Sequence, residues 1–240
     1  FEGNTGPYIL YTIVRIKSIL TKYGDLCLLW FDTPGVITKE QSLELHAMIK
    51  KYQPDCLINS RIGYGLGDYR NAADNGIPVL SLEKPWEVPM TMNSSWGYIR
   101  RDKTFKSKET IMESMTRIVG RGGNLLLNLG PDENGMPVKD HTQVLDEIGA
   151  WLEKNGESIY NTTGTPNFPY FIHWGDLTCS ADKKTLYAHV RKYPVFPFRP
   201  LLTGLKTKVK RIRLVATGEE LNFTQSYEQG RDEYRLYFFL

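Results

Sequence analysis

Cysteine and histidine are scarce in this sequence, whose 240 residues include three of the first and four of the second. Cys27, Cys56 and Cys179 are too few and too widely spaced for a disulfide framework. The first two lie inside apolar runs and are predicted to be buried thiols. The histidines show no paired ligand spacing, and His46 and His141 are predicted to lie on helix surfaces. We therefore expect no metal site and no other cofactor.

Long apolar runs are also lacking, because no stretch approaches the roughly 20 residues that a membrane-spanning helix needs. The 30 Lys and Arg residues nearly balance the 27 Asp and Glu residues and leave a net charge of +3. The most basic stretch, residues 206–213, alternates with Val209 and Ile212. That alternation favours a strand with one solvated face over a phosphate-binding patch. We expect neither nucleic acid nor a membrane as partner.

A serine-nucleophile motif and a dinucleotide-binding motif are missing as well. No Gly-x-Ser-x-Gly elbow of a serine hydrolase occurs. Gly63, Gly65 and Gly67 do not follow the order of a dinucleotide-binding loop, and no helix opens directly after them. Neither an initiator Met nor a signal peptide opens the sequence at Phe1, which favours a processed or truncated segment.

Helical and strand-like patterns alternate over the first 160 residues. This alternation predicts a parallel sheet, either open and doubly wound or closed into an eight-stranded barrel, of which four strands are half. Helices are expected at about 8–23, 38–52 and 107–120 and in a last segment ending near 155, and strands at 26–31, 56–58, 78–82 and 124–129.

Beyond residue 160 the pattern changes to short alternating segments between Gly, Pro and Asn turns, as at 185–190, 211–215 and 234–239. Such segments predict an antiparallel β-domain, a sandwich. The sequence thus predicts two domains, a barrel half at 1–160 and a β-sandwich, not necessarily complete, at 161–240. The junction is expected between residues 160 and 169.

An acidic residue ends the first apolar strand. In barrel enzymes the catalytic groups gather at the carboxyl ends of the strands, and Asp32 follows Trp30 and Phe31 there. A carboxylate beside aromatic rings is typical of a nucleophile in a sugar-binding site. The same pattern also suits an Asp that caps the Thr-Pro-Gly turn after it, and the spacing alone leaves both interpretations open.

A second carboxylate is needed if Asp32 is such a nucleophile, because retaining glycoside hydrolysis uses one carboxylate as nucleophile and another as acid/base. Glu87 follows Trp86, an aromatic setting that favours a protonated acid. Asp74 lies in a loop, where it could equally form a turn, and Glu87 could equally pair with an arginine. The candidates are Asp68, Asp74, Glu83 and Glu87.

Six short motifs together resemble one family. In chain order they are Tyr23-Gly24-Asp25 leading to Leu29-Trp30-Phe31-Asp32; Asn59-Ser60-Arg61; Gly67-Asp68-Tyr69; Trp86-Glu87 with Ser95-Trp96-Gly97-Tyr98; Gly122-Gly123-Asn124-Leu125-Leu126-Leu127-Asn128 with Gly130-Pro131; and Asn155-Gly156-Glu157-Ser158-Ile159-Tyr160. The sequence carrying them resembles glycoside hydrolase family 29, the α-L-fucosidases, over about two thirds of its length.

The resemblance implies a (β/α)8-like barrel followed by a β-sandwich. It also implies an exo-acting enzyme that removes terminal α-L-fucose from glycans with retention, through a covalent intermediate on Asp32. Arg61 and Trp96 match family residues that contact or line the bound fucose, and Trp30 and Trp86 complete the expected substrate-binding set. Asp74 is the positional match for the acid/base and is preferred, with Glu87 as the alternative acid/base or a pocket residue.

The family's first barrel strands and its fucose-binding histidines precede the matched motifs, and this chain begins too late to contain them. We expect the missing half to come from the same precursor or another chain, and the isolated segment to be inactive. A secreted, periplasmic or lysosomal location is implied. Two other functions stay open: a fucose-binding protein without turnover, and a retaining barrel glycosidase for another sugar.

Overall fold

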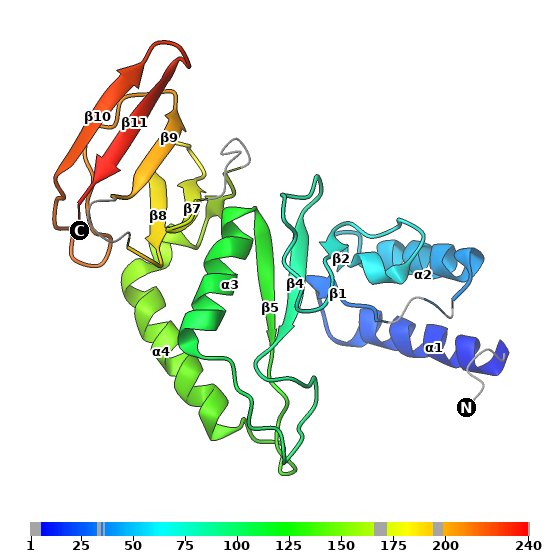
Figure 1. Ribbon diagram of the computed structural model, residues 1–240. Coiled ribbons are helices and arrows are strands. Elements are labelled where there is room, and N and C mark those ends of the chain that lie inside the picture. Colours follow the sequence, from blue (N-terminus) through cyan, green and yellow to red (C-terminus); the bar gives the residue numbers. More distant parts are fainter. Residues whose placement is uncertain (1–5, 33–34, 36, 166–171, 194–198, 240) are drawn as a thin grey trace. The chain divides into compact units, whose positions relative to one another are not determined.

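The computed structural model describes residues 6–32, 35, 37–165, 172–193 and 199–239. It is a mixed α/β structure with both parallel and antiparallel strand pairs (Figure 1). The chain divides into two compact units. The first unit comprises residues 1–73 and 82–87, and the second comprises residues 74–81 and 88–240.

The first unit is built on a short parallel strand pair. Its elements are α1 (Gly6–Lys22), β1 (Leu28–Leu29), α2 (Lys39–Tyr52), β2 (Leu57–Ile58), the 3-10 helix η2 (Ser60–Ile62), β3 (Arg70–Asn71) and the start of β4 (Trp86–Thr91). Strand β1 pairs with β2 in parallel, and β3 pairs in parallel with the start of β4. The carboxyl ends of β1 and β2 therefore lie at the same edge.

Helices α1 and α2 supply the apolar core of this unit. Leu45 and Ile49 of α2 lie one turn apart and are buried with Ile58 of β2, as expected for the apolar stripe of an amphipathic helix. The predicted start of α2 is confirmed, since the Thr38 hydroxyl accepts from the backbone N–H of Gln41 in a capping box. The core thus fixes β2, and with it the residues that follow the strand.

The second unit begins with a strand and helix alternation. The remainder of β4 lies beside β5 (Gly123–Asn128), followed by α4 (Lys139–Asn155) and the 3-10 helix η3 (Gly156–Ser158), with α3 (Lys108–Gly120) between the two strands in sequence. Ser107 caps α3 as predicted, accepting from the backbone N–H of Thr110. Met92, Ile111 and Ile148 form the core between these elements.

Two antiparallel sheets follow. The first contains β6 (Thr162–Thr163), β7 (Gly175–Ser180) and β8 (Leu186–Val190), and the second contains β9 (Leu201–Leu205), β10 (Phe223–Glu228) and β11 (Glu233–Phe238). Trp174 and Leu177, from the first of these segments, share one buried cluster with Leu202, Leu236 and Phe238. The strands predicted at 185–190 and 234–239 are confirmed.

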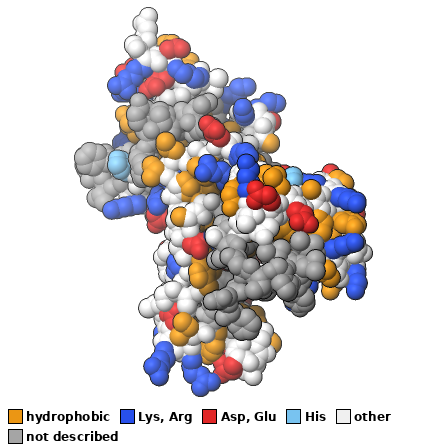
Figure 2. All heavy atoms as spheres, turned by 90° about the vertical axis from the view of Figure 1, so that its right-hand side faces the viewer, with side chains coloured by type: hydrophobic (Ala, Val, Ile, Leu, Met, Phe, Trp, Pro, Cys, Tyr) orange, Lys and Arg blue, Asp and Glu red, His pale blue; other side chains and the backbone are white. Residues whose placement is uncertain are grey.

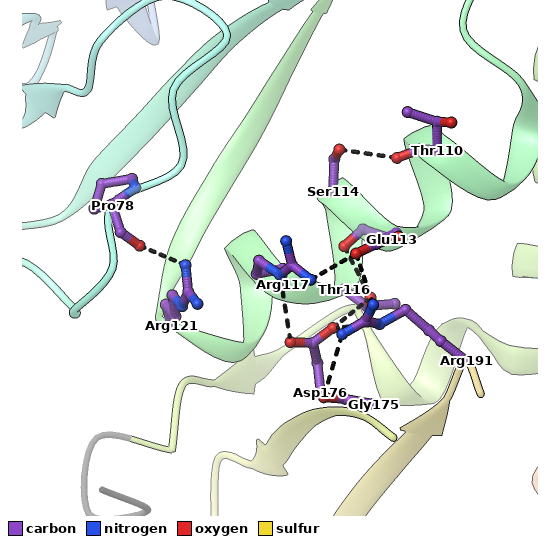
Figure 3. Close-up of polar contacts among 10 residues, drawn as sticks. All are labelled: Pro78, Thr110, Glu113, Ser114, Thr116, Arg117, Arg121, Gly175, Asp176 and Arg191. Atoms are coloured by element: carbon purple, nitrogen blue, oxygen red, sulfur yellow. Dashed lines mark hydrogen bonds and ion pairs between the residues drawn. The ribbon is translucent and has the colours of Figure 1, made fainter. Parts of the chain in front are cut away.

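An arginine and carboxylate network ties α3 to β7 and to Arg191, the residue that follows β8 (Figure 3). Arg117 and Arg191 both donate to Glu113 Oε1 at 2.6 Å. Arg191 also pairs with Asp176 at 2.9 Å, and the Asp176 carboxylate accepts from Thr116 at 3.3 Å. These contacts fasten the first antiparallel sheet onto the last turns of α3.

Three predicted strand segments are wrong. Residues 78–82 are irregular, and Val79 and Leu80 are 70% and 76% exposed. The strand lies at Trp86–Thr91 instead, where every residue except Glu87 is buried, as in a strand that is covered on both faces. Residues 211–215 form a single bridge, from Arg213 to Glu220, and the strand expected across 206–213 is absent from this described stretch.

Two burial predictions are also wrong, while that for Cys56 is confirmed by its 1% exposure. Cys27 is exposed, because β1 is only two residues long and starts after it. His141 is not on a helix surface but is 2% exposed, because Phe105 and the loops before α4 cover the first turn of that helix.

Within the described residues, no helix is both long and apolar enough to cross a membrane. On the face drawn in Figure 2, Lys and Arg side chains are interspersed with Asp and Glu.

Candidate active site

Asp32 and Arg61 meet at the carboxyl ends of β1 and β2. Nη1 of Arg61 donates to Oδ1 of Asp32 at 2.6 Å. Asp32 is 58% exposed on its side chain and Arg61 19%, so a carboxylate open to a ligand is held by a largely buried cation. Both residues lie just beyond paired parallel strands, which is why positions 29 apart in sequence come together.

Trp30 extends this pair towards a second carboxylate. The guanidinium of Arg61 lies 4.9 Å from the centre of the Trp30 ring, a cation–π contact. Nε1 of the same indole donates to Oε1 of Glu87 at 2.5 Å. Asp32, Arg61, Trp30 and Glu87 thus form one continuous series of contacts, all within the first unit.

Glu87 is also held by Asn71 of β3 and by Tyr69, which directly precedes that strand. Its Oε1 accepts from Nδ2 of Asn71 at 2.6 Å and from the hydroxyl of Tyr69 at 3.4 Å. Burial, followed by the negative charge of Glu87, raises the pKa of Tyr69 well above its usual range. Its hydroxyl therefore stays protonated and remains a donor, and the three donors together fix the direction in which the Glu87 carboxylate points.

Asn59 positions the segment that carries Asp32. This buried side chain accepts from the backbone N–H of Phe31 at 2.7 Å and donates to the carbonyl of Phe31 at 2.8 Å. The backbone hydrogen-bond ladder between β1 and β2 ends after two residue pairs. The side-chain amide of Asn59 adds two hydrogen bonds beyond that end. Phe31 precedes Asp32, so Asn59 sets where the carboxylate emerges.

Asp68 and Glu83, two of the other candidate carboxylates, lie in surroundings different from those of Asp32. Asp68 forms an ion pair with Lys50 at 2.9 Å and accepts from the backbone N–H of Ile58 at 2.9 Å. It fastens β2 to α2, a structural role. Glu83 is exposed in the loop before β4. Trp86, predicted to bind substrate, is 1% exposed and belongs to the core.

Asp74 and Trp96 belong to the second unit. Asp74 is exposed in the turn at residues 74–75. The turn is anchored by Asn75, whose Oδ1 accepts from the backbone N–H and the hydroxyl of Thr91 at 3.0 and 3.1 Å. Trp96 is 43% exposed, and its carbonyl accepts from Nδ2 of Asn128 at 2.7 Å. Their predicted roles remain predictions.

Sequence reasoning marked Asn59, with Arg61, as a residue at a strand end but gave it no role, and it missed Tyr69 and Asn71 as site residues. Tyr69, which forms a bridge with Asn59 directly before β3, and Asn71 of β3 are two positions apart in extended chain and so share one face; no strand was expected there from the sequence. Among the described residues, no group of three or more His, Cys, Asp or Glu side chains could hold a metal ion.

The comparisons with known proteins confirm the family resemblance of the motifs. The family model described as Alpha-L-fucosidase matches residues 2–157. The chain belongs to the α-L-fucosidase family. The solved α-L-fucosidase from Vibrio sp. strain EJY3 is 30% identical and superposes with a TM-score of 0.86, covering 99% of this chain and 44% of that one. This family member therefore has the fold of solved α-L-fucosidases.

Curated relatives of this chain are also named alpha-L-fucosidases. The plasma alpha-L-fucosidase of Rattus norvegicus is 30% identical over 91% of this chain and 50% of its own length. The tissue alpha-L-fucosidase of Mus musculus is 35% identical over 73% of this chain and 40% of its own. This α-L-fucosidase family chain thus spans about half the length, or less, of these curated relatives.

Proposed function

We propose that this chain carries the catalytic residues of a retaining exo-α-L-fucosidase. The observation that supports the proposal is the series of contacts between Asp32, Arg61, Trp30 and Glu87. In it, Arg61 contacts both Asp32 and Trp30, and Trp30 in turn contacts Glu87. It brings two carboxylates and an aromatic face into one site, with Asp32 beyond the carboxyl end of β1 and Glu87 at the start of β4. Two carboxylates beside a sugar are the minimum equipment for glycoside hydrolysis.

The proposed reaction proceeds by double displacement. A carboxylate oxygen of Asp32 attacks the anomeric carbon of the terminal fucose while the bond to the leaving oxygen breaks, and the acid/base gives that oxygen a proton. Water then attacks the fucosyl-enzyme ester, returning a proton to the acid/base and releasing fucose from Asp32. Arg61 holds the Asp32 carboxylate in place, and the indole of Trp30 lies beside it as an apolar wall for the sugar.

We favour Glu87 as the acid/base on its contacts, although the positional match had preferred Asp74. Glu87 lies in the same unit as Asp32 and is joined to it through two shared neighbours. Asp74 lies on an exposed turn of the other unit. Asp74 is kept as the competing candidate in the test below.

The nucleophile is tested with an aryl α-L-fucoside and a protein that contains these residues, comparing the parent with Asp32→Gly and a matched Asp68→Gly. We expect Asp32→Gly to lose turnover by roughly a thousandfold or more. Added azide should then restore release of the phenol and form a β-fucosyl azide. Asp68→Gly should keep turnover per folded molecule, and an active Asp32→Gly without azide would sink the assignment.

The acid/base is tested by comparing Glu87→Gln with Asp74→Asn on two aryl fucosides that differ in leaving-group acidity. The variant that removes the acid should lose far more activity with the poor leaving group than with the good one. Azide should also yield an α-fucosyl azide in that variant, because azide replaces water at the second step. If Asp74→Asn shows this pattern and Glu87→Gln does not, Asp74 is the acid/base.

The finer domain arrangement belongs to the same proposal. We infer that residues 1–160 are half of a (β/α)8-like barrel and that the two antiparallel sheets of residues 161–240 form a β-sandwich. Leu126 of β5, 42% exposed, lies in an apolar run on the last strand of its sheet, and such an edge calls for a further strand. We propose that the other half of the barrel, from the same precursor or another chain, supplies it.

Substrate and location follow from the proposed activity. A terminal α-L-fucose on an oligosaccharide or glycoconjugate is the proposed substrate, and a secreted, periplasmic or lysosomal site of action is proposed with it. A protein that binds fucosides with unchanged affinity in the parent and in Asp32→Asn, and hydrolyses them in neither, would instead be a binding protein.

A further inference from the structure

Tyr64 is an exposed aromatic residue on the loop that follows Arg61. The residue is 55% exposed and belongs to the first unit, three positions after Arg61. Three residues of chain span at most about 11 Å. Tyr64 therefore lies at the carboxyl edge of the β1 and β2 pair, the edge that also carries Asp32.

The backbone of Tyr64 is in the left-handed region, with φ at 52°. Glycine adopts this region freely, whereas a bulky side chain is strained there. Gly63 and Gly65 on either side also have positive φ, at 91° and 75°, so a third glycine would fit the same backbone with less strain. Burial does not offset the strain, because the side chain is exposed. Strain of this kind gathers where a residue serves a ligand.

The ring of Tyr64 is nonetheless held in one place. Its hydroxyl donates to the carbonyl of Ile37 at 2.8 Å, and Ile37 lies between Asp32 and the start of α2. Gly67 closes the loop against the backbone of Ser60, so tightly that a Cβ on Gly67 would overlap it. The side chain of Tyr64 thus connects the segment after β2 to the segment after β1.

A fixed and exposed aromatic ring beside a sugar site suits a second sugar. The C–H groups on the face of a pyranose can pack against the apolar face of a tyrosine ring. A ring that is already held in place loses little freedom on binding, so less of the contact energy is lost to ordering. In the proposed function Asp32, Arg61 and Trp30 serve the fucose itself, and no contact is assigned to the sugar that carries the fucose.

We propose that Tyr64 forms the binding surface for the sugar residue to which the terminal fucose is attached, with its ring stacked against that sugar. Tyr64 thereby favours fucosylated saccharides over simple fucosides and takes no part in bond breaking. The inference rests on the proposed fucosidase function and adds a specificity-determining residue to it.

Hydrolysis of two kinds of substrate tests the proposal in a protein that contains these residues. The first is α-L-fucosyl fluoride, whose leaving group carries no sugar. The second is a fucosylated saccharide: 2′-fucosyllactose, 3-fucosyllactose or fucosyl-α-1,6-N-acetylglucosamine. Tyr64→Asn removes the ring and introduces a residue that tolerates positive φ, so the variant should fold. We expect its kcat/KM to fall roughly tenfold on the best saccharide and to stay unchanged on the fluoride.

Two further variants separate the ring from its hydroxyl and from exposure in general. Tyr64→Phe keeps the ring and loses the bond to Ile37, so it should retain most of the kcat/KM on the saccharide. Tyr23→Asn removes a 74% exposed tyrosine that precedes β1, at the opposite edge of the strand pair, and should change neither rate. Three results for Tyr64→Asn would overturn the proposal: no loss on the saccharide, an equal loss on the fluoride, or a loss no larger than that of Tyr64→Phe.

The outcomes for Tyr64 and for the proposed function are distinguishable. A parent that hydrolyses the fluoride but none of the three saccharides overturns the role of Tyr64 alone. A parent that hydrolyses neither contradicts the proposed fucosidase function, and calorimetry with the three saccharides then decides on Tyr64. Its role stands if the parent binds one of them more tightly than Tyr64→Asn does, and equal affinities overturn it.

Discussion

Arg61 Nη1 lies 2.6 Å from Asp32 Oδ1, and this contact joins the two residues that follow neighbouring parallel strands. Because the guanidinium also lies over the indole of Trp30, Arg61 uses both its edge and its face. A lysine could supply the charge, but it could not supply a flat cation that stacks and donates at once.

Arg61→Lys should therefore reduce catalysis even though the charge is kept. A hydrogen bond between charged groups contributes about 1.5 to 3 kcal/mol, so kcat/KM on an aryl α-L-fucoside should fall roughly 10- to 100-fold. The exposed Arg70 of β3 provides the control, and Arg70→Lys should leave kcat/KM unchanged. Equal rates for both variants and the parent would show that stacking on Trp30 plays no part.

Asn59→Ala should destabilise the fold and displace the site together. The substitution leaves the backbone N–H and carbonyl of Phe31 without the amide that bonds both. At about 1 to 3 kcal/mol for each of the two unsatisfied groups, the free energy of unfolding should fall by about 2 to 6 kcal/mol. Urea denaturation measures the loss, with the exposed Asn134→Ala as reference. A loss below that of the reference would contradict the ladder role of Asn59.

His189 should make stability depend on pH. Thr178 donates its hydroxyl proton to the carbonyl of Ser158, so it accepts from Nε2 of His189 at 3.0 Å. Burial lowers the pKa of His189, so the unfolded chain, with a histidine pKa near 6.5, binds a proton more readily than the folded one. Stability is then lost as pH falls from about 6.5 through the folded pKa.

The measurement for His189 compares the parent with His189→Gln, which keeps a donor for Thr178 but does not titrate. Between pH 7 and pH 5 the unfolding free energy of the parent should fall relative to that of the variant. Parallel curves over this range would mean that His189 does not carry the effect.

Two glycines should respond to alanine in opposite directions. A Cβ at Gly175 of β7 would overlap the carbonyl oxygen of His189 on β8, so Gly175→Ala should cost about 3 kcal/mol or more. A Cβ at Gly149 of α4 meets no atom within 4 Å, so Gly149→Ala should stabilise by about 0.5 to 1 kcal/mol. Thermal unfolding distinguishes the two, and a neutral Gly175→Ala would show that the β7 and β8 strands can separate at little cost.

The helices were predictable from sequence because their apolar stripes and caps are local signals. Thr38 and Ser107 begin α2 and α3 as predicted, and the strand at residues 124–129 lies within one residue of β5. Val79 and Leu80 misled the strand prediction because an apolar pair after a proline looks like a strand. Only the packing of Trp86 and Val88 shows which segment is buried.

The candidate site, like the fold, could be predicted only in part from the sequence. Asp32, Arg61 and Glu87 could be named because strand ends and aromatic neighbours mark them in the sequence. Tyr69 and Asn71 could not, since their meaning depends on the pairing of β3 with β4. His141 was placed on a surface because helical periodicity does not show that a loop from another part of the chain covers the first turn of α4.

The hydrogen bond from the Phe31 N–H to Asn59 makes the hydrogen exchange of this one amide a measure of local opening at the site. An amide in an irregular segment after a two-residue strand would ordinarily exchange its hydrogen with solvent quickly. Here the amide hydrogen can exchange only when its hydrogen bond to the Asn59 side chain breaks. The same event frees the segment that carries Asp32. The exchange rate of this single hydrogen therefore reports how often the segment after β1 opens, with no substrate and no turnover needed.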